Sequence, residues 1–179
     1  MDVSPSGSGT VEVNETTPSS YPSTSTFSSG TSVQLRAVSA AGYRFDNWSG
    51  DLSGTTNPTA IVIGCNKEVT ANFSQIMHTL TIQLIGSGST TPERGIHSYS
   101  EGTIVNIIAN ADSGWQFDSW TGDVTDPYSA NTTVTIDSDK IATANFSQVK
   151  PSWWLISGIT AGVIIIGMTI WLAFRRRAV

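Results

Sequence analysis

The side chains with the greatest chemical capacity in this sequence are two histidines, one cysteine and several closely spaced aspartates. His78 and His97 could act as acid, base or zinc ligand, but neither has a second histidine or a cysteine at the spacing of a zinc site. Cys65 is alone, so no intrachain disulfide can form. The sequence contains no Gly-x-Ser-x-Gly nucleophile elbow and no phosphate-binding loop. We therefore predict that the protein is not an enzyme and uses no cofactor.

Pairs of aspartates offer one further chemistry, because carboxylate oxygens are the usual ligands of calcium. Three such pairs occur, namely Asp137/Asp139, Asp46/Asp51 and Asp118/Asp123. Gly64 and Asn66 stand at the positions that correspond to the first pair earlier in the chain, which favours a hairpin turn there. We predict no metal site and keep calcium at the other two pairs as the alternative.

Those two aspartate pairs belong to a ten-residue motif that occurs twice, at 42–51 and 114–123. Both copies read Gly, aromatic, any residue, Phe, Asp, any residue, Trp, Ser or Thr, Gly, Asp. In a regular strand the Trp would face away from the Phe three residues earlier, so a bulge between them is predicted to bring the rings to one side. The defining residues are Gly42, Tyr43, Phe45, Trp48, Gly50 and Asp51, and Gly114, Trp115, Phe117, Trp120, Gly122 and Asp123.

The motif has two interpretations, one structural and one functional. A module of about 70 residues has little apolar surface to bury, and one buried Trp or Phe contributes roughly 1.5–3 kcal/mol. We therefore interpret the rings as core, the second glycine as a turn with positive φ, and the final aspartate as a cap for backbone donors. The alternative is an aromatic platform that binds a sugar ring or a peptide.

The repetition extends over two modules, predicted at 1–75 and 76–148. Both modules end with the same six-residue sequence, Thr-Ala-Asn-Phe-Ser-Gln. Apolar residues alternate with polar ones in short β-branched runs, such as Leu80, Ile82 and Leu84, which predicts five or six mostly antiparallel strands per module. The fold class is all-β. Module 1 carries a Ser/Thr/Pro-rich insertion within 16–29.

Module 1 also has a clipped first strand. Its Gly-Ser-Gly triplet at 7–9 aligns with the triplet at 86–88, and this alignment puts Met1 on Leu80, inside the first strand of the second module. No signal peptide is visible in the first residues given, which contain neither a basic nor an apolar region. We expect the chain to be the C-terminal piece of a longer exported protein.

These motifs resemble the divergent internalin-B-type B-repeat of bacterial surface proteins. The resemblance rests on G-[YW]-x-F-x-x-W-x-G-D followed by K-x-[VA]-T-A-N-F, and it covers about residues 1–148. It implies two small tandem modules, β-grasp-like as in the better-known internalin repeats or small sandwich-like, on a secreted or surface protein. It brings no catalytic residues with it.

After a juxtamembrane linker at 149–152, the segment 153–174 contains 22 residues without charge, long enough at about 1.5 Å per residue to cross a bilayer as a helix. Tryptophans lie near both of its ends, where indoles prefer the membrane interface. Gly158 and Gly162 could let two such helices approach closely. The tail at 175–179 begins with Arg175, Arg176 and Arg177, which the positive-inside rule places in the cytoplasm with the modules outside the cell.

Charge and composition narrow the functional classes. Residues 1–150 carry 14 acidic side chains and six basic ones, which argues against nucleic acid as a partner. We predict a membrane-anchored, non-enzymatic cell-surface protein that acts as stalk, spacer or adhesion module, with the lipid bilayer as its partner. The alternative is a receptor for polysaccharide or protein that uses exposed aromatic rings or the outward-facing Ile104 and Ile108. A third possibility is an enzyme fragment whose catalytic domain lies upstream.

Overall fold

The computed structural model describes residues 1–150, which form thirteen β-strands and no helix. No helix within that range is long and apolar enough to cross a membrane. The helix predicted over 153–174, its Gly158 and Gly162, and the tail at 175–179 lie outside the described residues.

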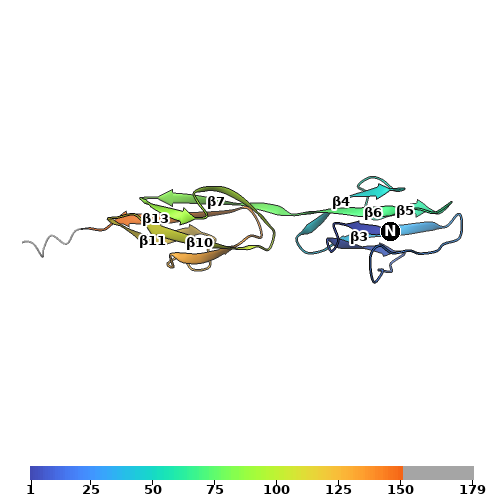
Figure 1. Cartoon of the computed structure of the whole chain (residues 1–179), viewed down its shortest axis with the longest axis horizontal. Helices are drawn as coiled ribbons and strands as arrows, with labels where there is room; N and C mark the ends of the chain where they lie inside the picture. The colour runs from blue at the N-terminus through green and yellow to red at the C-terminus, as the bar shows by residue number, and fades with distance from the viewer. Residues whose placement is uncertain (151–179) are drawn as a thin grey trace, which may run out of the picture.

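The first module is a sandwich of two three-stranded sheets, at the right of Figure 1. One sheet has the order β1-β6-β4, in which β1 runs parallel and β4 antiparallel to the central β6. The other has the order β2-β3-β5 and is antiparallel throughout. The strands are β1 (Asp2–Ser4), β2 (Gly9–Val13), β3 (Ser32–Ser39), β4 (Tyr43–Gly50), β5 (Thr59–Val62) and β6 (Val69–Gln75).

The second module repeats this plan and adds one strand. Its larger sheet has the order β11-β13-β7-β9, with β7 parallel to β13, and its smaller sheet has the order β12-β10-β8. The added strand β9 pairs antiparallel with β7 at the edge of the larger sheet. The strands are β7 (Met77–Ile85), β8 (Gly88–Thr91), β9 (Gly95–Ser100), β10 (Ile104–Ala111), β11 (Trp115–Gly122), β12 (Asn131–Thr135) and β13 (Lys140–Gln148).

Each module buries its own core between its two sheets. The alternating residues of the strands explain this, because every second side chain of β3, β6, β10 and β13 faces inward and is buried. Within residues 1–150 no helix covers either sheet, so the small sandwich describes the modules and the β-grasp does not.

The first strand of module 1 is shorter than the sequence alignment suggests. Asp2 pairs with Thr70, so Met1 lies opposite Val69, which is where Ile82 lies opposite Ala142 in module 2. Met1 therefore occupies the place of Ile82 and not of Leu80. The reason is that the connection from β1 to β2 is two residues longer than the connection from β7 to β8, although both end on the same Gly-Ser-Gly triplet.

The Ser/Thr/Pro-rich segment 16–29 has two parts. Met1 and Ser23 exchange two backbone hydrogen bonds of 2.8 Å, at the position where Ile82 pairs with Gly95 of β9. Residues 23–29 therefore follow the path of β9, and the extra residues of this segment come before Ser23.

One polar side chain weakens the second core. Thr90 on β8 is opposite Ala109, as Val11 on β2 is opposite Ala37, and the Thr90 hydroxyl is buried without a hydrogen-bond partner among residues 1–150. Because an unsatisfied buried hydroxyl costs about 1–3 kcal/mol, Thr90→Val is expected to raise the free energy of unfolding of module 2 by about 1–2 kcal/mol. Urea unfolding measures this gain, and Val11→Thr should lower the stability of module 1. A Thr90→Val chain less stable than the parent would contradict the account.

Candidate functional site

The repeated motif lies on β4 and β11, each paired antiparallel with the last strand of its module. The pairing shifts register between Phe45 and Asn47, and again between Phe117 and Ser119, so each copy has the predicted bulge at its aspartate. The bulge turns the tryptophan to the same side as the phenylalanine. The motif thus forms a corner inside each sandwich.

The aromatic rings of each corner pack together in the same arrangement. The Phe45 ring centroid lies 5.1 Å from Trp48 and 5.7 Å from Phe73, with the two phenylalanines edge to face. In module 2 the corresponding distances are 6.0 Å and 5.9 Å. Trp48 and Trp120 are only 2% and 1% exposed, whereas the remaining motif aromatics are half-buried. Neither tryptophan offers a face to a ligand.

The two corners differ in how the indole is satisfied. Trp48 Nε1 donates a hydrogen bond of 2.9 Å to the carbonyl oxygen of Thr56. Trp120 Nε1 is buried without a partner in the described part of the chain. The loop after β4 therefore supports the first indole in a way that the loop after β11 does not.

The Thr-Ala-Asn-Phe-Ser-Gln sequence at the end of each module holds the bulge in place. Asn72 Nδ2 donates to Asn47 O at 3.2 Å and to Ser49 Oγ at 2.9 Å, and Asn145 makes matching bonds to Ser119 and Thr121. The hydroxyls of Ser74 and Ser147 donate to the bulged aspartates Asp46 and Asp118, both at 2.9 Å. The Thr-Ala-Asn-Phe-Ser sequence and the aromatic motif thus form one structural unit.

The final aspartate of the motif pairs with a lysine and with a backbone amide. Asp51 accepts a hydrogen bond of 2.8 Å from Glu68 N and lies 3.4 Å from Lys67 Nζ. The Glu68 N–H, together with Lys67, lowers the pKa of the Asp51 carboxyl. The predicted backbone cap is therefore present in module 1.

In module 2 the equivalent lysine is shared between two carboxylates. Lys140 Nζ lies 2.7 Å from Asp137 and 3.4 Å from Asp123, and these two carboxylates, Asp137 foremost, raise the pKa of the lysine. Within residues 1–150, no group of three or more His, Cys, Asp or Glu side chains is placed to hold a metal ion.

The two histidines lie in module 2, apart from the aromatic corner. His78 Nε2 lies 3.4 Å from Glu101, and Asp139 accepts a hydrogen bond of 2.7 Å from Thr79 N, which lowers the pKa of Asp139. His97 Nε2 lies 2.7 Å from the carbonyl oxygen of Glu93. The contacts of His78 and Thr79 connect β7 with the turns before β10 and β13, and the contact of His97 connects β9 with the turn before it.

The glycines that close the motif have steric reasons to be glycine. Gly50 and Gly122 have φ values of 92° and 112°, and an added Cβ would collide with the carbonyl oxygens of Glu68 and Ile141. Only glycine adopts this positive φ at low cost and has no Cβ to collide with the neighbouring backbone.

Of the outward-facing aliphatic residues, Ile104 is 67% exposed at the start of β10, while Ile108 is half-buried in the middle of that strand. Cys65 is exposed in the turn before β6. The structure therefore brings the aromatic rings shared by both copies of the motif into the cores and leaves single apolar side chains outside.

Two sandwiches in tandem, each built on the same buried aromatic corner, define this chain as a tandem β-repeat protein. The family model of the divergent InlB B-repeat domain matches residues 2–77 and 78–150, so the chain belongs to that family. No curated protein and no solved structure matches the chain.

Proposed function

We propose that this protein is a membrane-anchored spacer that holds a surface structure away from the cell, and that it performs no catalysis. The divergent InlB B-repeat family suggests a cell-surface repeat module. The apolar segment 153–174 and the arginines after it supply the anchor and set the modules outside the cell.

The observation that carries the spacer proposal is the junction between the modules. β6 ends at Gln75 and β7 begins at Met77, so a single residue, Ile76, lies between the last strand of one sandwich and the first strand of the next. Figure 1 shows the two modules end to end, with the extended chain of β6 and β7 running from one module to the other. Such a connection has little freedom to bend, because a flexible linker needs several residues without hydrogen bonds.

Backbone hydrogen bonds hold the junction residue on both sides. Ile76 N donates to the carbonyl oxygen of Gly42 at 2.8 Å, and Glu101 N donates to the carbonyl oxygen of Ile76 at 2.9 Å. The Ser100 hydroxyl adds a bond of 3.2 Å to Gln75 Oε1. The first glycine of the aromatic motif thus helps to fix the angle between the modules.

The receptor alternative is less well supported. An aromatic platform needs exposed rings, whereas Trp48 and Trp120 lie inside the cores. Ile104 is exposed but is a single side chain, and single exposed apolar residues are common on protein surfaces.

The spacer proposal predicts a fixed distance between the modules. Cys65 is exposed, and Ser138 occupies the equivalent turn of module 2, so Ser138→Cys creates a matched pair for spin labels in the full chain. We expect one narrow distance distribution by electron paramagnetic resonance. Inserting Gly-Ser-Gly-Ser after Ile76 should broaden it, and the same insertion after Ser19 should not. A broad distribution in the chain without an insertion would refute the spacer.

A further inference from the structure

The outward side of β13, β7 and β9 in module 2 carries a group of exposed apolar side chains. Met77 and Ile85 lie on β7, Ile96 on β9 and Ile141 on β13, and each is between 50% and 72% exposed. They share one side of the sheet because the residues that alternate with them, such as Leu80, face the core. We call this side of the three strands the neutral face, for the reason given below.

The sheet register brings two of these residues into one row. Ile141 lies opposite Thr81, and Thr81 lies opposite Ile96, so the row crosses all three strands. Because neighbouring strands are about 4.8 Å apart, the two isoleucines lie about 10 Å apart with Thr81 between them. The row is therefore an apolar patch and not a pair of unrelated exposed side chains.

The neutral face has no charged side chain, although the protein is acidic. Residues 1–150 contain 14 acidic and six basic side chains. The outward positions of β7, β9 and β13 carry only Met, Ile, Ser, Thr, Asn and Gln. Like charges that oppose each other weaken an interface, so this is a side on which two copies of an acidic protein can meet without repulsion.

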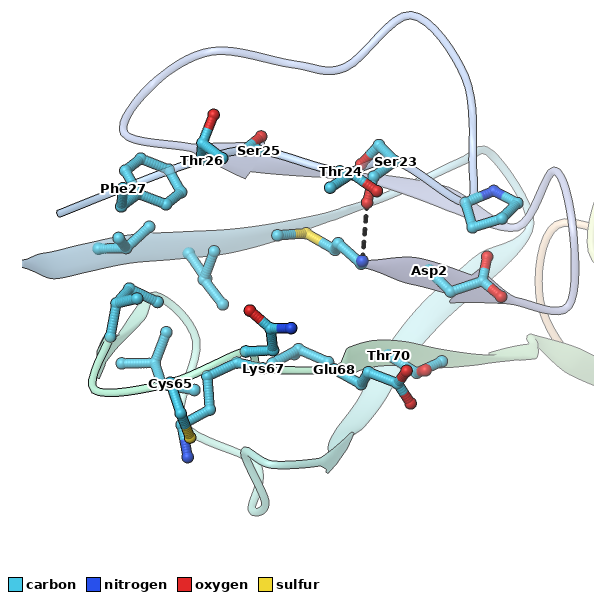
Figure 2. Close-up of a pocket in the computed structure, with 18 of the residues that line it drawn as sticks. Asp2, Ser23, Thr24, Ser25, Thr26, Phe27, Cys65, Lys67, Glu68 and Thr70 are labelled. Carbon is cyan, nitrogen blue, oxygen red and sulfur yellow. Dashed lines mark hydrogen bonds between the residues drawn. The ribbon is translucent and has the colours of Figure 1, made fainter. Parts of the chain in front are cut away.

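Module 1 carries charge at the equivalent places. By their positions in the sheet, Ile141 corresponds to Glu68 and Gln83 corresponds to Asp2. Both acidic side chains are exposed, and Figure 2 shows them beside β1 and at the start of β6. The same kind of sheet thus folds with a glutamate at this position, so the fold does not explain why residue 141 is an isoleucine.

We propose that the neutral face binds the neutral face of a second copy of this chain, anchored in the same membrane. This inference rests on the proposed membrane anchor and extends the proposed function, because the spacer then stands as a pair. Two copies anchored in one bilayer have the same orientation, so a two-fold axis along the membrane normal relates them.

The direction of the strands fits such an axis. β7 and β13 run parallel to each other, and Figure 1 shows them along the long axis of the chain. In a spacer that stands upright on the membrane, the two-fold axis therefore brings the two larger sheets face to face with their strands aligned. Aligned sheets are one of the two common arrangements in which sheets pack.

The size of the neutral face fits a pair that forms in a membrane. β7 has nine residues, so at about 3.3 Å per residue and about 4.8 Å between strands the face measures roughly 30 Å by 15 Å. Two such faces bury about 1,000 Å², which is at the lower limit of specific interfaces. Anchoring in one bilayer raises the effective concentration of the two faces and compensates for the small area.

Cross-linking of the full chain in phosphatidylcholine vesicles tests the pair. In a Cys65→Ser background, Gln83→Cys places one thiol in the centre of the neutral face. Asn106→Cys places it instead on the outward side of β10, in the other sheet. A short bis-maleimide should join two chains through position 83 roughly fivefold or more faster than through position 106, because only the first thiol faces its copy across the two-fold axis.

Ile141→Glu is the variant that should separate the pair. It puts a carboxylate into the neutral face of each copy, and Glu68 shows that the sheet accepts this residue. Cross-linking through position 83 should fall roughly fivefold or more, because a buried unpaired carboxylate weakens an interface, while the thermal transition of module 2 stays unchanged. Ile104→Glu is the matched control, since Ile104 is 67% exposed in the other sheet, and it should leave cross-linking unchanged.

The outcomes separate this pair from the spacer itself. Cross-linking that is equal at the two positions, or that Ile141→Glu leaves unchanged, would show that the neutral face does not hold the chains together. A chain that floats with the vesicles and does not cross-link would also overturn the pair, while a narrow spin-label distance, measured with unlabelled chain in excess, would still support the spacer. A chain that does not float with the vesicles would overturn the anchor and the pair together.

Discussion

Replacing Trp120 with alanine is expected to remove about 3–5 kcal/mol of the stability of the second module and to leave the first module unchanged. The indole is 1% exposed and lies at the centre of a corner that also contains Phe117 and Phe146. A buried Trp→Ala change costs about 3–5 kcal/mol, and a module of this size has about 4–11 kcal/mol in total. Hydrogen exchange followed module by module measures the loss, because the two cores share no residue.

The comparison of Trp48→Phe with Trp120→Phe provides the control. Both changes keep an aromatic ring in the core, but only Trp48→Phe removes a hydrogen bond, the one to Thr56 O. Trp48→Phe should therefore destabilise its module by about 1 kcal/mol more than Trp120→Phe destabilises the other. Equal losses would show that the Thr56 bond contributes nothing, and a Trp120→Ala loss below about 1 kcal/mol would show that the corner is not the centre of the core.

Gly122→Ala is expected to have the second largest effect, a loss of about 3 kcal/mol in module 2. The residue combines a φ of 112° with a backbone position where a Cβ would collide with the carbonyl oxygen of Ile141. The collision is with backbone of the paired β13 and cannot be relieved by a side-chain rotation, so β11 and β13 must separate locally. Urea unfolding of the full chain measures the change.

Gly114→Ala is the matched control, because it lies at the other end of the same motif. Its φ is 82°, but no atom of the described residues lies within 4 Å of an added Cβ. Only the left-handed conformation opposes the substitution there, at a cost of about 1–2 kcal/mol. If Gly122→Ala were no worse than Gly114→Ala, close packing against β13 would not explain the glycine.

Much of the fold was predictable from local patterns. Alternation with period two in runs such as Leu80, Ile82 and Leu84 is a direct consequence of strand geometry, and these runs are strands. The bulge was predictable as well, because the three-residue spacing from Phe45 to Trp48 cannot put both rings on one side of a regular strand. Because both features occur in two copies, local patterns also indicate two modules.

The position of Met1 could not be obtained in this way. Alignment on the Gly-Ser-Gly triplets assumes connections of equal length, and the two extra residues between β1 and β2 shift the strand by two places. Nothing local marks this shift, because a turn accommodates added residues without changing the strands around it. For the same reason the path of residues 23–29 along the place of β9 was not visible in their Ser/Thr-rich composition.

The sequence by itself determined the strand periodicity, the repeat and the bulge that brings the aromatic rings to one side, because these depend on neighbours within a few residues. Tertiary structure alone decided that Asn72 holds the bulge beside Asn47 and that Asp51 meets Lys67. These features depend on which strands become neighbours in a sheet. That choice is made by long-range pairing and burial, which no short stretch of sequence records.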